Sequence, residues 1–382
     1  MTELTAALSS DVDVRVVTTR KLSSDPKVRL PHKEHKGRVQ IYRIWTTRLG
    51  RPNLLWRAID YLSFHLSVQF FLLRHVRRGD IVVLKTDPPL LQLFTTGVIR
   101  LKRGKVINWI QDIYPEIAER LGKFPGPGWL SGFVKAWRDR ALNRAARNIV
   151  ISEPMAAYLR QRAVAGVEVI PNWADGSAIT PVEHGENPLR SEWGLAGKFV
   201  VMYSGNFGRV HALEEIIEAA TKLADEPEIQ FVFVGEGAGL AGLKDALAAA
   251  SVGNAVFEPF QPRARLRFSL GAADLHLVSL KNGMEELVMP SKLYGIMAAG
   301  RPVAFVGQPD SAIGAFIQKE NIGFSVSSGE GAVLAESIRE LAKNPGRALH
   351  GGENARVLFE TEYSLGAGAV RWRTLLASVQ SS

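Results

Sequence analysis

Apolar positions along the chain fall into short runs, which alternate with longer stretches in which apolar residues recur at helical spacing. The short runs predict strands, and the longer stretches predict helices that cover them. Strands are predicted at 12–17, 39–45, 80–85, 106–111, 148–151 and 167–170, with long helices at 54–76 and 130–146. This alternation is typical of an α/β fold in which helices cover both faces of a parallel sheet.

A second set of strands and helices follows a loop at 172–188 that is rich in Gly, Pro, Asn and Asp. Such a loop is typical of a linker, and 382 residues are too many for one ordinary core. We therefore expect two doubly wound, Rossmann-like domains, at 1–180 and 181–360. A last helix within 361–382 is predicted to cross back to the first domain.

The first domain begins in an unusual way. Residues 1–8 have helical spacing and the strand at 12–17 follows them, whereas a doubly wound domain opens with a strand, a glycine-rich loop and then a helix. We expect this first strand and loop to be missing before Met1. Mass spectrometry of the native N-terminus tests the expectation, and a native start at Met1 would contradict it.

The composition narrows the class of protein. Apolar residues make up 46% of the chain and charged residues 22%, which is typical of a globular protein and excludes a disordered one. The chain has no cysteine, which excludes a disulfide framework and a thiolate nucleophile and fits a reducing cytoplasm. The eight histidines show no ligand spacing, and Asp11-Val12-Asp13 precedes a strand instead of following one. We therefore expect no metal site.

Charge is distributed unevenly along the chain. Residues 1–180 contain 29 Lys and Arg against 15 Asp and Glu, a balance of +14, whereas the remainder has a balance of −5. The basic half should favour an anionic partner such as a phospholipid surface, a lipid pyrophosphate or nucleic acid, unless it is simply a solvated basic surface. Segments 61–73 and 133–147 place apolar side chains beside arginines, as interfacial membrane helices do. The second is the better interfacial candidate, while the first is favoured as a helix that covers the core. Nucleic acid is disfavoured because these residues lie on predicted helices.

One candidate binding site follows the apolar run at 199–203. Gly205, Asn206, Gly208 and Arg209 form a loop in which small residues would let backbone N–H groups approach a diphosphate, while the arginine pairs with a phosphate oxygen. The alternative is an ordinary turn between a strand and a helix. Several such loops on one edge of a parallel sheet would make a nucleotide-diphosphate site.

Two further segments predict parts of the same site. Gly235 and Gly237 follow the strand at 231–234, where they would let a nucleoside lie close to the strand end. Phe260 would then flank the base, or else belong to the core. The match of Gly237–Gly242 to G-x-G-x-x-G, with Glu258 further on, supports a rival NAD-dependent oxidoreductase, but this fingerprint belongs in the first βαβ unit of a domain.

The start of a late helix predicts an anion-binding group. Ser291 is a plausible N-cap, Lys292 adds a point charge for a phosphate, and the amides near Leu293 are free donors at a helix start. The alternative is a capped helix with one exposed lysine. Glu285 or Glu286 could accept hydrogen bonds from ribose or sugar hydroxyls, although paired loop glutamates are usually only solvated.

A carboxylate in the basic domain is a candidate for contacting an acceptor. Asp112 follows the predicted strand at 106–111, where it could touch a sugar hydroxyl or orient an acceptor. The alternative is an aspartate that caps the next helix.

Taken together, these motifs resemble glycosyltransferase family 4, and within it the bacterial surface-polysaccharide transferases. The segments that carry the resemblance are 109–116, 151–155, 170–175, 203–208, 234–237 and 290–302. The resemblance implies a GT-B fold, with two Rossmann-like domains facing across a cleft and the donor held mostly by the second. It also implies retaining transfer of a hexosyl, N-acetylhexosaminyl or fucosaminyl group from a nucleotide-diphosphate sugar, without cofactor or metal.

The resemblance further implies roles and a cellular location. Arg209 and Lys292 would neutralise the departing diphosphate, and Asp112 would serve the acceptor, a lipid-linked saccharide at the cytoplasmic face of the inner membrane. The sequence departs from the family at Gly295, where a second glutamate is common, so that Glu285 or Glu286 would supply the remaining carboxylate. The acceptor-side glycine-rich loop would lie before Met1. A non-catalytic scaffold and a sugar-nucleotide 2-epimerase of the same fold are the alternatives.

Overall fold

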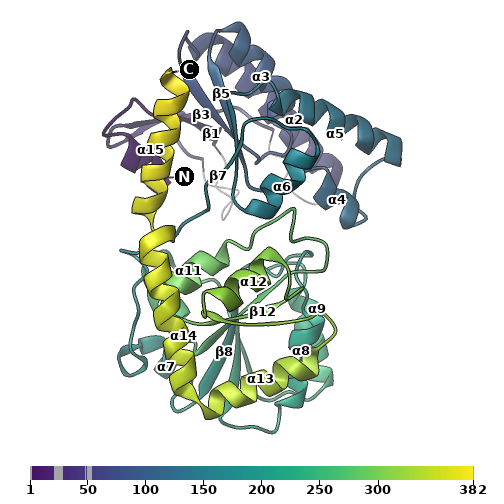
Figure 1. Ribbon diagram of the computed structural model, residues 1–382, viewed down its shortest axis with the longest axis vertical. Helices are drawn as coiled ribbons and strands as arrows, with labels where there is room; N and C mark the ends of the chain where they lie inside the picture. Colours follow the sequence, from purple (N-terminus) through teal and green to yellow (C-terminus); the bar gives the residue numbers. More distant parts are fainter. Residues whose placement is uncertain (1, 21–28, 48, 50–53, 382) are drawn as a thin grey trace. The chain divides into compact units, whose positions relative to one another are not determined.

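The computed structural model describes residues 2–20, 29–47, 49 and 54–381. The chain forms two compact units, which are drawn in Figure 1. The first comprises Met1–Glu119, Lys123–Pro171 and Gly368–Ser382, and the second comprises Arg120–Gly122 and Asn172–Ala367. The chain passes into the second unit after Pro171, earlier than residue 180, because the next residues pair within that unit: Ala174 N donates to Tyr363 O at 3.2 Å.

The second unit is built on a parallel sheet of six strands in the order β10-β9-β8-β11-β12-β13. The first strand of the unit, β8, lies in the middle, and the sheet grows from it to both sides, as in a doubly wound fold. The strands are β8 (Phe199–Ser204), β9 (Ile229–Val234), β10 (Ala255–Glu258), β11 (Leu275–Ser279), β12 (Val303–Val306) and β13 (Gly323–Val326).

Helices cover both faces of this sheet. Their apolar sides meet alternate residues of the strands in two clusters, one around Phe231 and Ile216 and one around Val200 and Val232. The helices are α7 (Pro188–Glu192), α8 (Glu214–Lys222), α9 (Leu240–Ala249), α10 (Leu266–Gly271), α11 (Lys292–Ala298), α12 (Ala312–Lys319), α13 (Gly331–Lys343) and α14 (Pro345–Leu358), followed by a π-helical turn at Phe359–Tyr363.

The first unit contains two groups of strands. A parallel sheet runs in the order β4-β5-β6-β7, and a smaller sheet runs in the order β1-β3-β2, in which β2 is antiparallel to β3. These strands are β1 (Arg15–Thr19), β2 (Lys33–Lys36), β3 (Val39–Ile44), β4 (Ile81–Lys85), β5 (Lys105–Ile110), β6 (Arg147–Val150) and β7 (Val167–Val169). The predicted strands are all present, and β2 is the strand of this unit that the sequence did not indicate.

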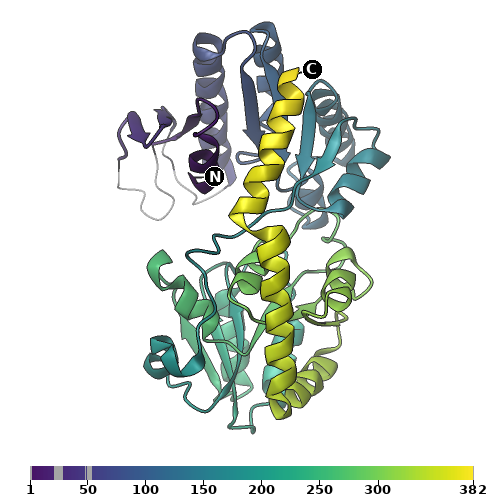
Figure 2. The same cartoon turned by 60° about the vertical axis from the view of Figure 1, so that its left-hand side comes forward.

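The first unit is completed by helices, including the last helix of the chain. They are α1 (Thr2–Leu8), α2 (Leu54–His75), α3 (Gln92–Leu101), α4 (Glu116–Arg120), α5 (Gly128–Leu142), α6 (Glu153–Gln161) and α15 (Leu365–Ser381). Trp372 of α15 packs on Trp109 of β5 with ring centroids 4.8 Å apart, and Lys105 Nζ donates to Val379 O at 2.7 Å. Figure 2 shows α15, in yellow, running across the strands of the first unit, as the prediction of a returning helix requires.

A membrane-spanning helix is not found among the residues that the structure describes.

Candidate active site

Three loops of the second unit follow neighbouring strands at the same edge of its sheet. The loops after β8, β9 and β11 lie together because β8 pairs with β9 on one side and with β11 on the other, all in parallel. The carboxyl ends of the strands around the first strand of a doubly wound sheet are where such folds bind their ligands. The predicted donor-site residues therefore share one sheet edge, and this includes Phe260, whose loop follows β10, the parallel neighbour of β9.

The loops after β8 and β9 pack backbone against backbone. Gly205 N donates to Val234 O at 2.9 Å, and a Cβ atom at Gly235 would overlap Gly205 O. Gly205 and Gly235 have φ of +141° and +135°, a region that favours glycine. The sequence analysis explained Gly235 by the close approach of a nucleoside. The contact between the two loops is by itself enough to require glycine at this position.

Gly237 has the same explanation. Its φ is +144°, and a Cβ there would lie 2.6 Å from Asn206 Oδ1 and 2.7 Å from Phe207 O. In contrast, a Cβ at Gly242, the last glycine of the G-x-G-x-x-G match, would meet nothing within 4 Å. In a dinucleotide fingerprint the last glycine allows close packing of the helix on the strand, and no such packing is present at Gly242. The match to the fingerprint is therefore coincidental.

Lys292 is the first residue of α11; the residue is half-buried, and its Nζ atom is buried. Its Nζ atom lies 3.4 Å from the centroid of the Tyr203 ring, and no hydrogen-bond acceptor for it is found in the described part of the chain. A Cβ at Gly205 would lie 3.3 Å from its Cε atom, so this side chain reaches the loop after β8. Burial lowers the pKa of Lys292 well below its usual value. The sequence alternative of an exposed lysine is wrong.

His211 joins this group, although sequence reasoning did not select it. Its Nδ1 atom bonds to Ser279 O at 2.7 Å. Because a carbonyl only accepts, Nδ1 carries the proton and Nε2 keeps its lone pair. Burial, and then the charge of Lys292, lower its pKa to about 4, so the ring is neutral at pH 7. A lone loop histidine carries no sequence signal of such a position.

The remaining predicted phosphate contacts are less tightly held. Arg209 is exposed and has no ion-pair or hydrogen-bond partner among the residues described, so its guanidinium is available to a ligand. It lies within a turn in which His211 N donates to Gly208 O at 3.3 Å. Ser291 occupies the N-cap position of α11 but makes no capping hydrogen bond with its side chain. Leu293 N already donates to Pro290 O at 3.2 Å, so this amide is not the free donor that was predicted.

The two glutamates after β11 differ sharply. Glu285 is 9% exposed, and its Oε1 atom has no hydrogen-bond partner within the described residues, whereas Glu286 is exposed. A buried acceptor without a partner suits a ligand hydroxyl. Phe260 is 50% exposed, which excludes the core alternative, and a Cβ at Gly235 would lie 3.2 Å from its ring.

The first unit holds the other candidate, Asp112, beside a small pocket. The pocket is lined by Thr86, Gln92, Asp112, Tyr114 and Arg138, among others, and the carboxylate follows β5 at the sheet edge. Burial, with a smaller effect of the neighbouring carboxylate of Asp87, raises the pKa of Asp112 to about 6. A carboxyl group with such a pKa exchanges protons close to neutral pH, as groups at functional sites often do.

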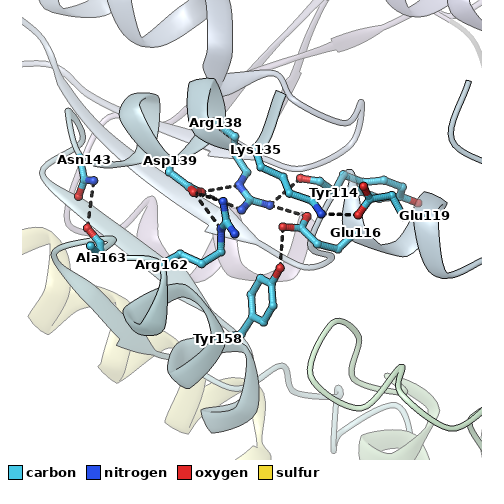
Figure 3. Close-up of polar contacts among 10 residues, drawn as sticks. All are labelled: Tyr114, Glu116, Glu119, Lys135, Arg138, Asp139, Asn143, Tyr158, Arg162 and Ala163. Atoms are coloured by element: carbon cyan, nitrogen blue, oxygen red, sulfur yellow. Dashed lines mark hydrogen bonds and ion pairs between the residues drawn. The ribbon is translucent and has the colours of Figure 1, made fainter. Parts of the chain in front are cut away.

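Arg138, which lines this pocket, belongs to a network of buried ion pairs (Figure 3). Arg138, 2% exposed, donates to Glu116 Oε2 at 2.6 Å, to Asp139 Oδ1 at 2.8 Å and to Tyr114 O at 2.8 Å. Tyr158 OH donates to the other oxygen of Glu116 at 2.8 Å, and Arg162 pairs with Asp139 at 2.7 Å. Each carboxylate is satisfied by more than one donor, so the network holds the Arg138 side chain at the pocket in a fixed position.

Metal-binding clusters are not found: within the described residues, no three His, Asp or Glu side chains group in a way that could hold an ion.

Comparison with known families decides what the two units are. The model of a family described as glycosyl transferase 4-like domain matches residues 1–173, and that of glycosyl transferases group 1 matches residues 187–358.

The chain belongs to the family 4 glycosyltransferases.

Curated relatives agree with this assignment. The chain is 29% identical to the Pseudomonas aeruginosa glycosyltransferase WbjE over 303 residues, covering 78% of this chain and 74% of that protein. It is also 29% identical to Escherichia coli (strain K12) WcaI, described as a glycosyl transferase of colanic acid biosynthesis, covering 74% and 71%. The protein is therefore a glycosyltransferase of polysaccharide biosynthesis, and the alternative of an NAD-dependent oxidoreductase is wrong.

Solved structures show the same fold. Sucrose-phosphate synthase from Thermosynechococcus elongatus superposes with a TM-score of 0.77 at 18% identity, covering 99% of this chain and 92% of that chain. Anabaena Alr3699/HepE, solved in complex with UDP, gives a TM-score of 0.67 at 15% identity, covering 89% and 86%. The predicted GT-B fold of the glycosyltransferases is confirmed.

Proposed function

We propose that this protein is a retaining glycosyltransferase that moves a sugar from a nucleotide-diphosphate sugar to a lipid-linked saccharide during bacterial surface-polysaccharide synthesis. The observation that carries the proposal is Lys292, whose buried Nζ atom has no hydrogen-bond acceptor among the described residues and lies next to the glycine loop after β8. A buried unpaired ammonium is costly, and a bound diphosphate is the kind of partner that would compensate it.

The chemistry follows from charge at the leaving group. The bond from the anomeric carbon to the diphosphate breaks, and the bond to the acceptor hydroxyl forms on the same face of the sugar. Negative charge then grows on the diphosphate, where Lys292 and Arg209 stabilise it. The diphosphate in turn raises the lowered pKa of Lys292, so the side chain is charged when the donor is bound. The acceptor's proton passes to the donor phosphate.

The other candidates take the parts of donor and acceptor. Gly205, Asn206 and Gly208 bring backbone groups close to the diphosphate, and Phe260 flanks the base. Glu285 accepts a hydrogen bond from a hydroxyl of the sugar or the ribose through its unpartnered Oε1 atom. Asp112 orients the acceptor hydroxyl from the pocket of the first unit.

The donor class is supported by the comparisons. The structures of Alr3699/HepE contain UDP or UDP-glucose, so a uridine diphosphate sugar is the first donor to test. We propose a hexosyl or N-acetylhexosaminyl type of transfer without cofactor or metal, because Lys292 and Arg209 can supply the positive charge that a metal ion supplies elsewhere. A chelator should then leave the rate of transfer unchanged.

The acceptor and its location rest on the relatives and on charge. WcaI is described as acting in colanic acid biosynthesis, and the +14 balance of residues 1–180 suits an anionic membrane surface. We therefore place the enzyme at the cytoplasmic face of the inner membrane, as a peripheral protein.

A panel of UDP-, GDP- and ADP-sugars in a thermal-shift assay tests the donor site, because ligand binding raises apparent stability. One nucleotide class should raise the melting temperature, and a panel without effect would contradict the proposal. NMR of the product then tests retention by comparing the anomeric configuration of donor and product. Labelled donor without acceptor should stay unchanged, whereas an epimerase would convert its sugar.

A further inference from the structure

Three helices of the first unit lie next to one another and carry apolar side chains on their outer faces. Phe94 of α3 packs against Trp137 of α5 with ring centroids 5.3 Å apart, and against His65 of α2 at 5.7 Å. The outward apolar side chains are Leu62 (58% exposed), Leu66 (64%), Phe70 (59%) and Leu73 (41%) on α2, Phe94 (43%) and Leu101 (75%) on α3, and Trp129 (74%), Phe133 (60%) and Trp137 (39%) on α5. We call this surface the three-helix face.

These side chains do not belong to the hydrophobic core. On α2, the residues that pack inside are Phe64, Val68 and Leu72, all buried, and the helical repeat places the outward residues on the opposite side of the helix. The sequence interpretation favoured the α2 segment as a cover for the core over an interfacial helix. The helix in fact has two apolar sides, of which one is left in water. An exposed apolar surface of this kind, in which Trp137 contacts the rings of both Phe94 and Phe133, marks an interaction site.

The charges around the three-helix face are mostly positive. The exposed cations at the ends of these helices are Arg74, Arg77, Arg78, Arg100, Arg103, Arg140 and Arg144. Helices α2, α3 and α5 themselves contain two acidic residues, Asp60 in α2 and Asp139 in α5. Asp60 bonds to Thr47 at 2.8 Å, and Asp139 is held in the buried network, so neither offsets these cations.

We propose that the three-helix face docks onto the headgroup region of an anionic phospholipid bilayer, with the apolar side chains inserted and the arginines on lipid phosphates. Tryptophan, phenylalanine and leucine beside arginine are the composition of helices that lie in a membrane interface. A second copy of the chain is a poorer occupant, because a symmetric contact would bring these arginines against one another.

This proposal specifies which surface would hold the enzyme at the membrane, and it rests on the proposed function, in which the acceptor is linked to a membrane lipid. The inner sides of α3 and α5 contribute Gln92 and Arg138 to the lining of the pocket that holds Asp112. Docking by the outer sides of the same helices would hold this pocket close to the surface in which a lipid-linked acceptor is embedded.

Sedimentation of the full chain with vesicles, without donor or acceptor, tests the docking. We expect binding to phosphatidylcholine vesicles that contain phosphatidylglycerol, weakened but not abolished by high salt, because salt screens the arginines and not the apolar contacts. The variant L66S/W129S/F133S should bind at least about tenfold more weakly, since each large apolar side chain loses its burial in lipid. The control variant V333S/L349S/V357S removes exposed apolar residues of the second unit and should bind normally.

A second measurement uses the unaltered protein. Vesicles of brominated lipid should quench its tryptophan emission, and W129F should lose much of that quenching. Unquenched wild-type emission, equal binding by the triple variant, or self-association through this face without vesicle binding would overturn the proposal. A protein that binds a nucleotide sugar but no vesicle would overturn the docking alone and leave the donor site intact.

Discussion

In Lys292 of the second unit, the charge of the amine conflicts with the burial of its Nζ atom. A buried charge that lacks a hydrogen-bond partner is costly, and here burial lowers the pKa of the Lys292 amine, which favours its neutral form when no anion is bound. The ring of Tyr203 offers the ammonium a partial substitute. The site is therefore held ready for an anion at some expense in stability, as functional sites often are.

A buried histidine allows a prediction at the same scale. His276 of β11 is fully buried, its Nε2 atom bonds to Leu270 O at 2.9 Å, and burial lowers its pKa from 6.5 to about 4. Below pH 6.5 the unfolded chain gains a proton that the folded chain does not gain until about pH 4. The free energy of unfolding should therefore fall as the pH drops through this window, by up to about 1.4 kcal/mol per pH unit for one such group.

Denaturant unfolding between pH 7 and pH 4 measures this slope. H276Q keeps an N–H for Leu270 O but cannot take up the proton, so its slope should be smaller than that of the wild type. H350Q replaces an exposed histidine of α14 and should leave the slope unchanged. Equal slopes for H276Q and the wild type would contradict the assignment.

Single residues were only partly predictable from the sequence. The sequence indicated Lys292 and Glu285 as candidates because they follow a strand. It did not predict how far they are buried, because burial depends on how three loops distant in sequence pack together. It missed His211 altogether, because the backbone carbonyl of Ser279 and the charge of Lys292 reach it only in the folded chain.

At the level of elements, the two glycine-bearing loops behave as one packed unit. Gly237 lies at φ +144° against Asn206 and Phe207, whereas Gly242 lies in α9 with open space around it. G237A should lower the free energy of unfolding by about 1–3 kcal/mol, the usual cost of a strained backbone conformation. G242A, a matched change in the same sequence motif, should raise it by about 0.5–1 kcal/mol. Urea unfolding of both variants checks the contrast, and a stable G237A would disprove the close packing.

The ion-pair network around Arg138 allows a second prediction at the level of elements. R138M removes the guanidinium of α5 and leaves the carboxylates of Glu116 and Asp139 buried without it. Breaking a buried pair in this way typically costs about 3–5 kcal/mol, which urea unfolding would detect. R140M, an exposed neighbour on the same helix, should change stability little. An R138M variant as stable as R140M would show that the network contributes nothing.

Elements were easier to predict than residues. The strands of the parallel sheets can be recognised in the sequence as apolar runs, because both faces of a parallel sheet are buried. β2 was missed because its sequence, Lys33-Glu34-His35-Lys36, is charged throughout, which is characteristic of an edge strand and of many loops. Helix α5 was predicted to extend to residue 146, but it ends at Leu142.

The whole molecule separates two tasks between two units. The second unit carries the buried lysine, the packed glycine loops and an acidic balance. The first unit carries the pocket with Asp112, the three-helix face and the basic balance. The sequence predicted both units and the returning last helix, because apolar periodicity and charge are properties of long segments. It indicated an interfacial role for the α5 segment and considered one for the α2 segment, but it did not show that α3 joins them in one face, because that depends on how the helices pack.

The most direct measurement is the rate of sugar transfer by K292M, compared with its stability. Methionine fills the space of the lysine without its charge, so the folded unit should be no less stable, while turnover should fall at least about 100-fold because the departing diphosphate loses its buried cation. K281M, an exposed lysine in the loop after β11, is the control and should keep near-normal turnover. A K292M enzyme that works at the normal rate would contradict the central claim that this lysine stabilises the leaving group.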